Sequence, residues 1–114
     1  MNCFNGEAYL KESINSVINQ TYQNWELVFW DNQSTDSSAE IYNSYNDLRM
    51  KYFYAKEHTN LGKARAKAYP LLSGEYFTVL DTDDLWYPSK IEEQLRCFED
   101  SSVGICITNT EFFS

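Results

Sequence analysis

Glycine and proline are scarce in this sequence, with four glycines and two prolines among 114 residues. It contains no repeat, low-complexity tract or linker, so we expect one domain over residues 1–114. No apolar run approaches the roughly 20 residues that span a bilayer, and the N-terminal residues lack the basic and apolar regions of a signal peptide. Hydrophobic residues make up 43% of the chain and aromatic residues 17%, which excludes a disordered protein.

Cysteine is also infrequent. Cys3, Cys97 and Cys106 are widely spaced and form no CxxC pair, which argues against a disulfide framework or a zinc site. Cys97 and Cys106 have apolar neighbours, and we interpret them as core thiols of a reducing compartment. The expected location is therefore the cytoplasm, including peripheral attachment at the inner face of the membrane.

Positive charge is in deficit, with 9 basic against 17 acidic residues and a net charge of −8. Such an acidic chain is a poor general binder of nucleic acid. Basic residues are nevertheless concentrated between Arg49 and Lys67, where Glu57 is the single acid. This basic island could bind a small anion, or it could be a solvated charged face.

Helical and strand-like segments alternate along the sequence. Apolar residues at helical spacing between Leu10 and Ile18 predict a helix, and the apolar run 25–30 predicts a strand covered on both faces. The further expected elements are a helix carrying Ala39, Ile41, Tyr42 and Tyr45, a strand at 51–55, a helix at 62–72 that kinks or ends early at Pro70, a strand at 76–80, a helix starting at Pro88 and a strand at 103–108. This order predicts an α/β fold, a mostly parallel sheet with helices on both faces.

Two of the expected strands are followed by acidic residues. Asp31 to Asp36 follow the strand at 25–30, and Asp81, Asp83 and Asp84 follow the strand at 76–80. Ligands of open parallel sheets bind at the carboxyl ends of strands, and crowded carboxylates favour a divalent cation. A plain aspartate-rich turn, with Asp84 capping the next helix, is the alternative. An EF-hand fits poorly, because Trp86 stands where that loop needs glycine.

A histidine and a tryptophan are further candidates for a site. The single histidine, His58, has no partner motif, and we interpret it as a surface loop residue. Trp86 follows the acidic loop and is a candidate for stacking on a sugar or base, whereas Trp25 and Trp30 are expected in the core.

Five segments of the sequence carry a family resemblance. They are 5–10 with 16–27, the segment 31–36 (DNQSTD), which is similar to D-D-x-S-x-D, the segment 61–65 (LGKAR), which is similar to G-x-x-x-A-R-N except for Ala66, the segment 74–76 (GEY), and the segment 80–88 (LDTDDLWYP) with its D-x-D motif. In this order they resemble the large family 2 of inverting glycosyltransferases, which have the GT-A (Rossmann-like) fold. The chain resembles its donor-binding portion, with the first strand and the acceptor half missing.

The resemblance implies transfer of a sugar from a nucleoside diphosphate sugar to an acceptor hydroxyl. It implies Mn²⁺ or Mg²⁺ held by Asp83 and Asp81, with Asp83 as the first choice of direct ligand and Asp81 on the ribose or on a metal-bound water. Asp84 replaces Asp83 if the alignment slips by one residue. Substrate contacts are implied for Asn5, Glu7, Asp31, Asn32, Arg65, Asp81 and Thr82. Because Asn32 replaces the second acid of D-D-x-S-x-D, we expect a loosened preference for uracil, unless Asp31 alone reads the base.

The acceptor could be a glycan, a lipid or a protein, and self-association through an open sheet edge is a further expectation. No residue matches the family's general base, so we expect no sugar transfer by the 114 residues alone. Two other functions stay open from the sequence. One is a non-catalytic nucleotide- or sugar-binding remnant, and the other is a phospho-receiver domain in which Asp84, four residues before Pro88, is phosphorylated.

Overall fold

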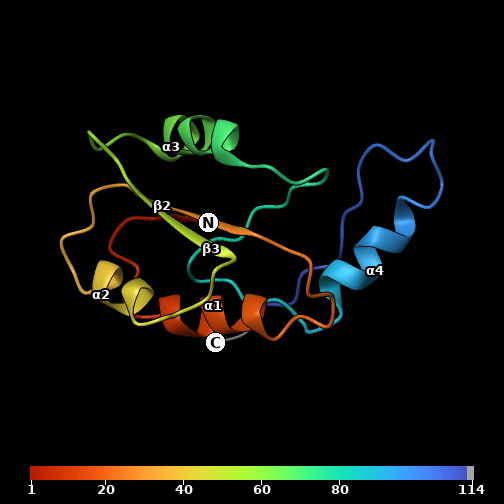
Figure 1. Cartoon of the computed structure of the whole chain (residues 1–114), viewed down its shortest axis with the longest axis horizontal. Helices are drawn as coiled ribbons and strands as arrows, with labels where there is room; N and C mark the ends of the chain where they lie inside the picture. Colours follow the sequence, from red (N-terminus) through yellow and green to blue (C-terminus); the bar gives the residue numbers. More distant parts are fainter. Residues whose placement is uncertain (113–114) are drawn as a thin grey trace.

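The structure is a computed structural model and describes residues 1–112. Its elements, in chain order, are β1 (Asn2–Cys3), α1 (Leu10–Ile18), β2 (Leu27–Asp31), α2 (Ser38–Asn43), β3 (Met50–Tyr54), α3 (Leu61–Ala68), the short 3-10 helix η1 (Tyr69–Leu71) and α4 (Lys90–Cys97). The three strands form one parallel sheet in the order β1-β2-β3. The α/β class, the parallel sheet and the helices on both of its faces are as the sequence predicts (Figure 1).

The core lies between the sheet and helices α1 and α2. Phe29 of β2 is fully buried and packs on the ring of Tyr42 of α2, with ring centroids 4.5 Å apart. Leu10 and Ile14 present the apolar stripe of α1 to the same core. The helical spacing read from the sequence therefore corresponds to the buried face of α1.

Helix α3 covers the opposite face of the sheet (Figure 1). Its small residue Ala64 is 1% exposed, and a small side chain at this point allows the helix to approach β1 and β2 closely. The helix ends at Ala68 and continues as η1 through Pro70, which confirms the expected early end. At its other end, Thr59 just before α3 is hydrogen-bonded to Asn32 just after β2, so the N-terminus of α3 lies beside the carboxyl end of β2.

Two expected strands are not formed. Residues 76–80 and 103–108 lie outside any strand, and the first of these segments is linked to the sheet by one isolated bridge between Asn2 and Asp81. A strand is stable only when its backbone groups pair with a neighbour. Strand β1 is two residues long, so its free edge offers the 76–80 segment little backbone to pair with beyond the bridge at Asn2. Phe77 and Val79 are exposed accordingly.

Other sequence-based assignments of burial also need correction. Cys97 and Cys106 are half-buried rather than core thiols, and Trp25 and Trp30 are half-buried as well.

Asp84 does not cap the last helix, because α4 begins at Lys90 after Ser89. Among the helices of residues 1–112, none has the length and apolar character required to cross a bilayer.

Candidate functional site

Two loops at the carboxyl edge of the sheet are bound to each other by a set of reciprocal hydrogen bonds. The loop after β1 contains Asn5, whose Oδ1 accepts from the Thr35 N–H at 2.8 Å, and whose N–H donates to Ser34 Oγ at 3.1 Å. Glu7 Oε2 accepts from the Ser37 N–H at 2.9 Å, and the Glu7 N–H donates to Asp36 Oδ2 at 3.0 Å. The predicted site residues Asn5 and Glu7 therefore hold the 31–38 loop in place.

We call the reciprocal hydrogen bonds of Asn5 and Glu7 with the 31–38 loop the latch, and Asp36 is the acidic residue that this loop contributes to it. Burial opposes its ionisation, but hydrogen bonds from Ser38 and from the Glu7 N–H outweigh that effect and lower the pKa of Asp36. The carboxylate form is thus matched to the donors around it. Asp36 therefore stabilises the junction of the two loops.

Gly6 sits at the tightest point between these loops and the acidic loop. A Cβ built on Gly6 would lie 3.1 Å from Cys3 Sγ and 3.1 Å from both Cβ and Oγ1 of Thr82. We expect Gly6→Ala to destabilise the fold by about 1–2 kcal/mol, because Thr82 must move away. Thermal denaturation measures this effect. Gly104→Ala is the control, since a Cβ there meets nothing within 4 Å. Equal stability of the two variants would contradict the prediction.

Asp31 ends β2 and is fully buried. Its Oδ1 accepts from the Ser34 N–H at 2.7 Å, and its Oδ2 accepts from the Tyr52 hydroxyl at 2.6 Å. Burial and this bond raise the pKa of the Tyr52 hydroxyl above its usual range. Both carboxylate oxygens of Asp31 are engaged within the protein, so its position is that of a residue that shapes the loop.

Asn32 is 5% exposed, and its side-chain amide is bound to the backbone of Thr59. Its Nδ2 donates to the Thr59 carbonyl oxygen at 2.6 Å, and its Oδ1 accepts from the Thr59 N–H at 3.2 Å. This pair of bonds joins the end of β2 to the loop that precedes α3. The side-chain amide of Asn32, which the family resemblance places at the nucleobase, thus also holds the loop before α3 in place, and we call this pair of bonds the clamp.

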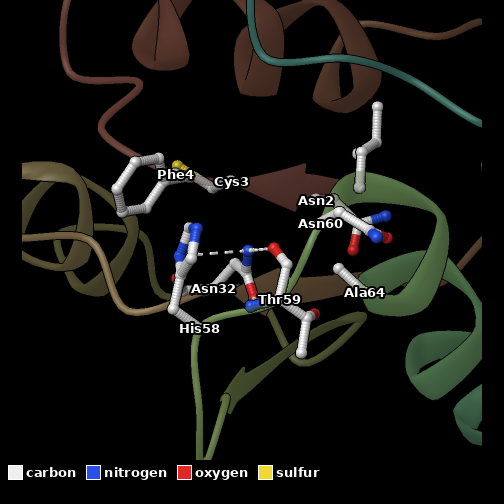
Figure 2. A pocket seen from close by; sticks show the side chains of 9 residues that line it. Asn2, Cys3, Phe4, Asn32, His58, Thr59, Asn60 and Ala64 are labelled. Atoms are coloured by element: carbon white, nitrogen blue, oxygen red, sulfur yellow. Dashed lines mark hydrogen bonds between the residues drawn. The ribbon is translucent and has the colours of Figure 1, made fainter.

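A pocket of 250 Å³ lies beside this clamp (Figure 2). The ring of Phe4, after β1, packs on the imidazole of His58, with centroids 4.3 Å apart. The lining residues are Asn2, Cys3, Phe4, Asn32, His58, Thr59, Asn60, Leu61 and Ala64. Sequence reasoning put His58 on the surface, where it is, but missed that it faces a pocket. The position of residues 55–60 after a parallel strand was the available signal, because loops after neighbouring parallel strands meet at one edge.

The acidic loop lies next to this pocket, across β1. Asp81 pairs with Asn2 in the isolated bridge, and its Oδ1 accepts from Arg65 Nη2 at 2.6 Å. Arg65 Nε is buried and has no hydrogen-bond partner among residues 1–112. Thr82 faces Gly6. The predicted site residues Arg65, Asp81 and Thr82 are therefore brought together.

The acidic loop is anchored by Ser13 of α1 at its near end and by Gln20, just after α1, at its far end. Gln20 is buried, and its Nε2 donates to the Tyr87 carbonyl oxygen at 2.8 Å, while its Oε1 accepts from the Ile91 N–H at 3.0 Å. Ser13 Oγ donates to the Asp81 carbonyl oxygen at 3.2 Å. Trp86 is half-buried under the ammonium group of Lys90, 4.2 Å from the ring centroid. The ring of Trp86, which was a candidate for stacking on a sugar or base, is thus covered by Lys90 in this structure.

The acidic loop carries the carboxylates Asp81 and Asp83, and hard divalent cations take oxygen donors of this kind. Asp83 is exposed, and no hydrogen bond to its carboxylate occurs within residues 1–112. These same residues contain no group of three or more His, Cys, Asp or Glu side chains that could hold a metal unaided. Mg²⁺ usually takes one or two carboxylates and completes its shell with water and phosphate oxygens. Asp83 with Asp81 fits that pattern.

Comparison with known proteins identifies the family. The family described as Glycosyl transferase family 2 matches residues 1–114. This chain belongs to that family. The match removes the phospho-receiver alternative. Among curated relatives, it is 43% identical over 100 residues to an uncharacterised glycosyltransferase of Haemophilus influenzae, covering 84% of this chain and 39% of the relative.

A second relative has a more specific name. The chain is 31% identical over 114 residues to the Escherichia coli UDP-Glc:alpha-D-GlcNAc-diphosphoundecaprenol beta-1,3-glucosyltransferase WfgD, covering 100% of this chain and 45% of the relative. Among solved structures, S. aureus TarS 1-349 in complex with UDP-GlcNAc matches with a TM-score of 0.82 and 26% identity, covering 87% of this chain and 30% of the TarS 1-349 chain. This chain therefore spans less than half the length of these proteins.

Proposed function

We propose that this chain forms the donor-binding part of a metal-dependent, inverting glycosyltransferase that uses a nucleoside diphosphate sugar. The relatives support the donor class, since WfgD is named for UDP-Glc and TarS is crystallised with UDP-GlcNAc. The proposed acceptor is a hydroxyl group on a glycan, a lipid or a protein. We assign no general base among residues 1–112.

The observation that carries the proposal is that a pocket, the guanidinium group of Arg65 and the carboxylates of Asp81 and Asp83 lie next to one another at the same edge of the sheet. The pocket beside Asn32 would take the base and ribose. Arg65, with an unused buried donor, would face the diphosphate. Charge-assisted bonds from a guanidinium to phosphate are strong and directional. Asp81 and Asp83 would hold the cation next to that diphosphate.

The divalent cation, when bound, neutralises the diphosphate and stabilises it as a leaving group. The chain's own residues do the positioning. The latch formed by Asn5 and Glu7 keeps the 31–38 loop closed, and Gln20 holds the far end of the acidic loop. A rigid frame of this kind lowers the cost of ordering the site when the donor binds.

Calorimetry tests the proposal. UDP, UDP-Glc and UDP-GlcNAc are titrated into the 114-residue chain with Mn²⁺, with Mg²⁺ and with a chelator. We expect binding that depends on the metal. Absence of binding to any nucleoside diphosphate under all three conditions would contradict the proposal.

Arg65 provides a second prediction. We expect Arg65→Lys to weaken binding of UDP by about tenfold, because a single ammonium group does not replace a planar fork on the diphosphate. Titration of UDP in Mn²⁺ measures this. Arg65→Ala removes the whole group, and Lys63→Gln is its control, because Lys63 is exposed on the same helix and each of these two substitutions removes one positive charge. If Arg65→Ala and Lys63→Gln both bind like the unmodified chain, the basic island is only a solvated face.

A further inference from the structure

The pocket wall contributed by the loop between β3 and α3 contains a histidine with one ring nitrogen already engaged. His58 Nδ1 lies 2.9 Å from the backbone carbonyl oxygen of Asn32. The imidazole also packs on the ring of Phe4, with the two rings inclined at 55° (Figure 2). The side chain is exposed and lines the pocket. His58 is thus oriented by the protein and still accessible to a ligand.

The partners of Nδ1 decide which nitrogen carries the hydrogen. A carbonyl oxygen only accepts, so the 2.9 Å contact requires a hydrogen on Nδ1. Asn32 Nδ2 donates one hydrogen to the Thr59 carbonyl oxygen at 2.6 Å, and its second hydrogen could face Nδ1, but that contact is longer, at 3.4 Å. The shorter contact to the carbonyl therefore defines the tautomer. In the neutral imidazole, Nε2 is then a hydrogen-bond acceptor.

Asn32 does not supply an acceptor to the same pocket. Its Oδ1 accepts from the Thr59 N–H at 3.2 Å, with the Thr59 hydroxyl at 3.4 Å. Its position corresponds to the second acid of the pattern D-D-x-S-x-D, so the acid that this pattern would place here is absent. Two side-chain acceptors of the pocket-lining residues have no intramolecular partner among residues 1–112, His58 Nε2 and Asn2 Oδ1. Asn2 Oδ1 is buried, whereas the His58 side chain is exposed and can be reached by a ligand.

We propose that His58 Nε2 accepts a hydrogen bond from a ring N–H of the nucleobase and so determines which base binds. Uracil carries a ring N–H at N3, whereas cytosine has a bare acceptor at that position. Two facing acceptors repel, and a polar group left unpaired in a pocket weakens binding. The pocket is therefore selective for uracil over cytosine. This inference rests on the proposed binding of a nucleoside diphosphate.

The test compares UDP with CDP in Mn²⁺, using the 114-residue chain and two variants. In His58→Asn, the amide lies near the place of Nδ1, so the bond to the Asn32 carbonyl is retained and Nε2 is lost. In His58→Gln, the amide oxygen reaches the place of Nε2, so an acceptor is retained. Thermal denaturation checks that both variants fold like the unmodified chain.

We expect the unmodified chain to bind UDP more tightly than CDP by about tenfold or more. His58→Asn should reduce this ratio to within about threefold, mainly by weakening UDP, and His58→Gln should restore part of it. An unchanged ratio in His58→Asn would overturn the inference, and so would equal binding of UDP and CDP by the unmodified chain. The latter result is the one expected if Asn32 itself loosens the choice of base.

Failure of the inference can be distinguished from failure of the proposed function. If UDP binds but His58 does not affect the ratio, the donor site stands and only the reading of the base by His58 is rejected. If neither UDP nor CDP binds the unmodified chain with Mn²⁺, the proposed donor site itself is rejected, and the inference falls with it.

Discussion

Replacing Asp83 with alanine is expected to weaken UDP binding in Mn²⁺ by at least about tenfold and to leave binding without metal no weaker. The side chain is exposed and forms no hydrogen bond within residues 1–112, so its removal should not disturb the fold. Calorimetry in Mn²⁺ and in a chelator gives the two affinities. The difference between them is the contribution of the metal.

The sign of the effect separates a metal ligand from a bystander. A carboxylate beside a diphosphate repels it when no cation lies between them. If Asp83 is not a metal ligand, Asp83→Ala should therefore strengthen the binding of UDP. A loss of affinity in Mn²⁺ therefore indicates coordination. Asp84→Ala is the matched control, since Asp84 is also exposed and lies next in the chain. If only Asp84→Ala loses affinity for UDP, the metal ligand is Asp84 rather than Asp83. Equal binding of UDP with and without chelator would contradict metal-dependent binding altogether.

The sequence was most informative where the structural cause is local. The apolar runs predicted strands at 25–30 and 51–55, and the structure has β2 at Leu27–Asp31 and β3 at Met50–Tyr54. The helical spacing at Leu10–Ile18 corresponds to α1. The segments at 76–80 and 103–108 have the same composition as real strands, but their formation depends on a neighbouring strand, which composition does not reveal.

The sequence predicted where the candidate site lies better than it predicted which residues contact one another there. Acids after strands identified the sheet edge where the pocket and the Arg65–Asp81 pair lie. The sequence did not reveal that Asp31 and Asn32 bind Tyr52 and Thr59, because these contacts cross more than 20 residues of chain. His58 was missed for the same reason, since its partners Phe4 and Asn32 come from two other loops.

Asp31 is the residue for which the structure most changes the expected consequence of a substitution. We expect Asp31→Ala to lower the free energy of unfolding by about 2–4 kcal/mol, because it leaves the Ser34 N–H and the Tyr52 hydroxyl without an acceptor in the interior. Asp31→Asn should have a smaller effect. Its amide oxygen can still accept from Ser34, and the Tyr52 hydroxyl can turn to accept from the amide nitrogen.

A double-mutant cycle with Tyr52→Phe isolates the bond between Asp31 and Tyr52. We expect a coupling energy of about 1–2 kcal/mol for this buried bond to a charged group. Urea denaturation of the single and double variants measures it. Tyr54→Phe is the control on the same strand, because Tyr54 is 57% exposed and its hydroxyl forms no hydrogen bond within residues 1–112.

The same variants distinguish a shaping role of Asp31 from direct contact with the donor. If Asp31 shapes the loop, Tyr52→Phe should weaken UDP binding in parallel with its loss of stability, although Tyr52 lies on β3 and does not line the pocket. If Asp31 contacts the base or ribose, Asp31→Ala should abolish binding while Tyr52→Phe leaves the affinity unchanged. Full stability of Asp31→Ala with complete loss of UDP binding would contradict the shaping role. The buried carboxylate at the end of β2 would then have to turn out of its two hydrogen bonds when the donor binds.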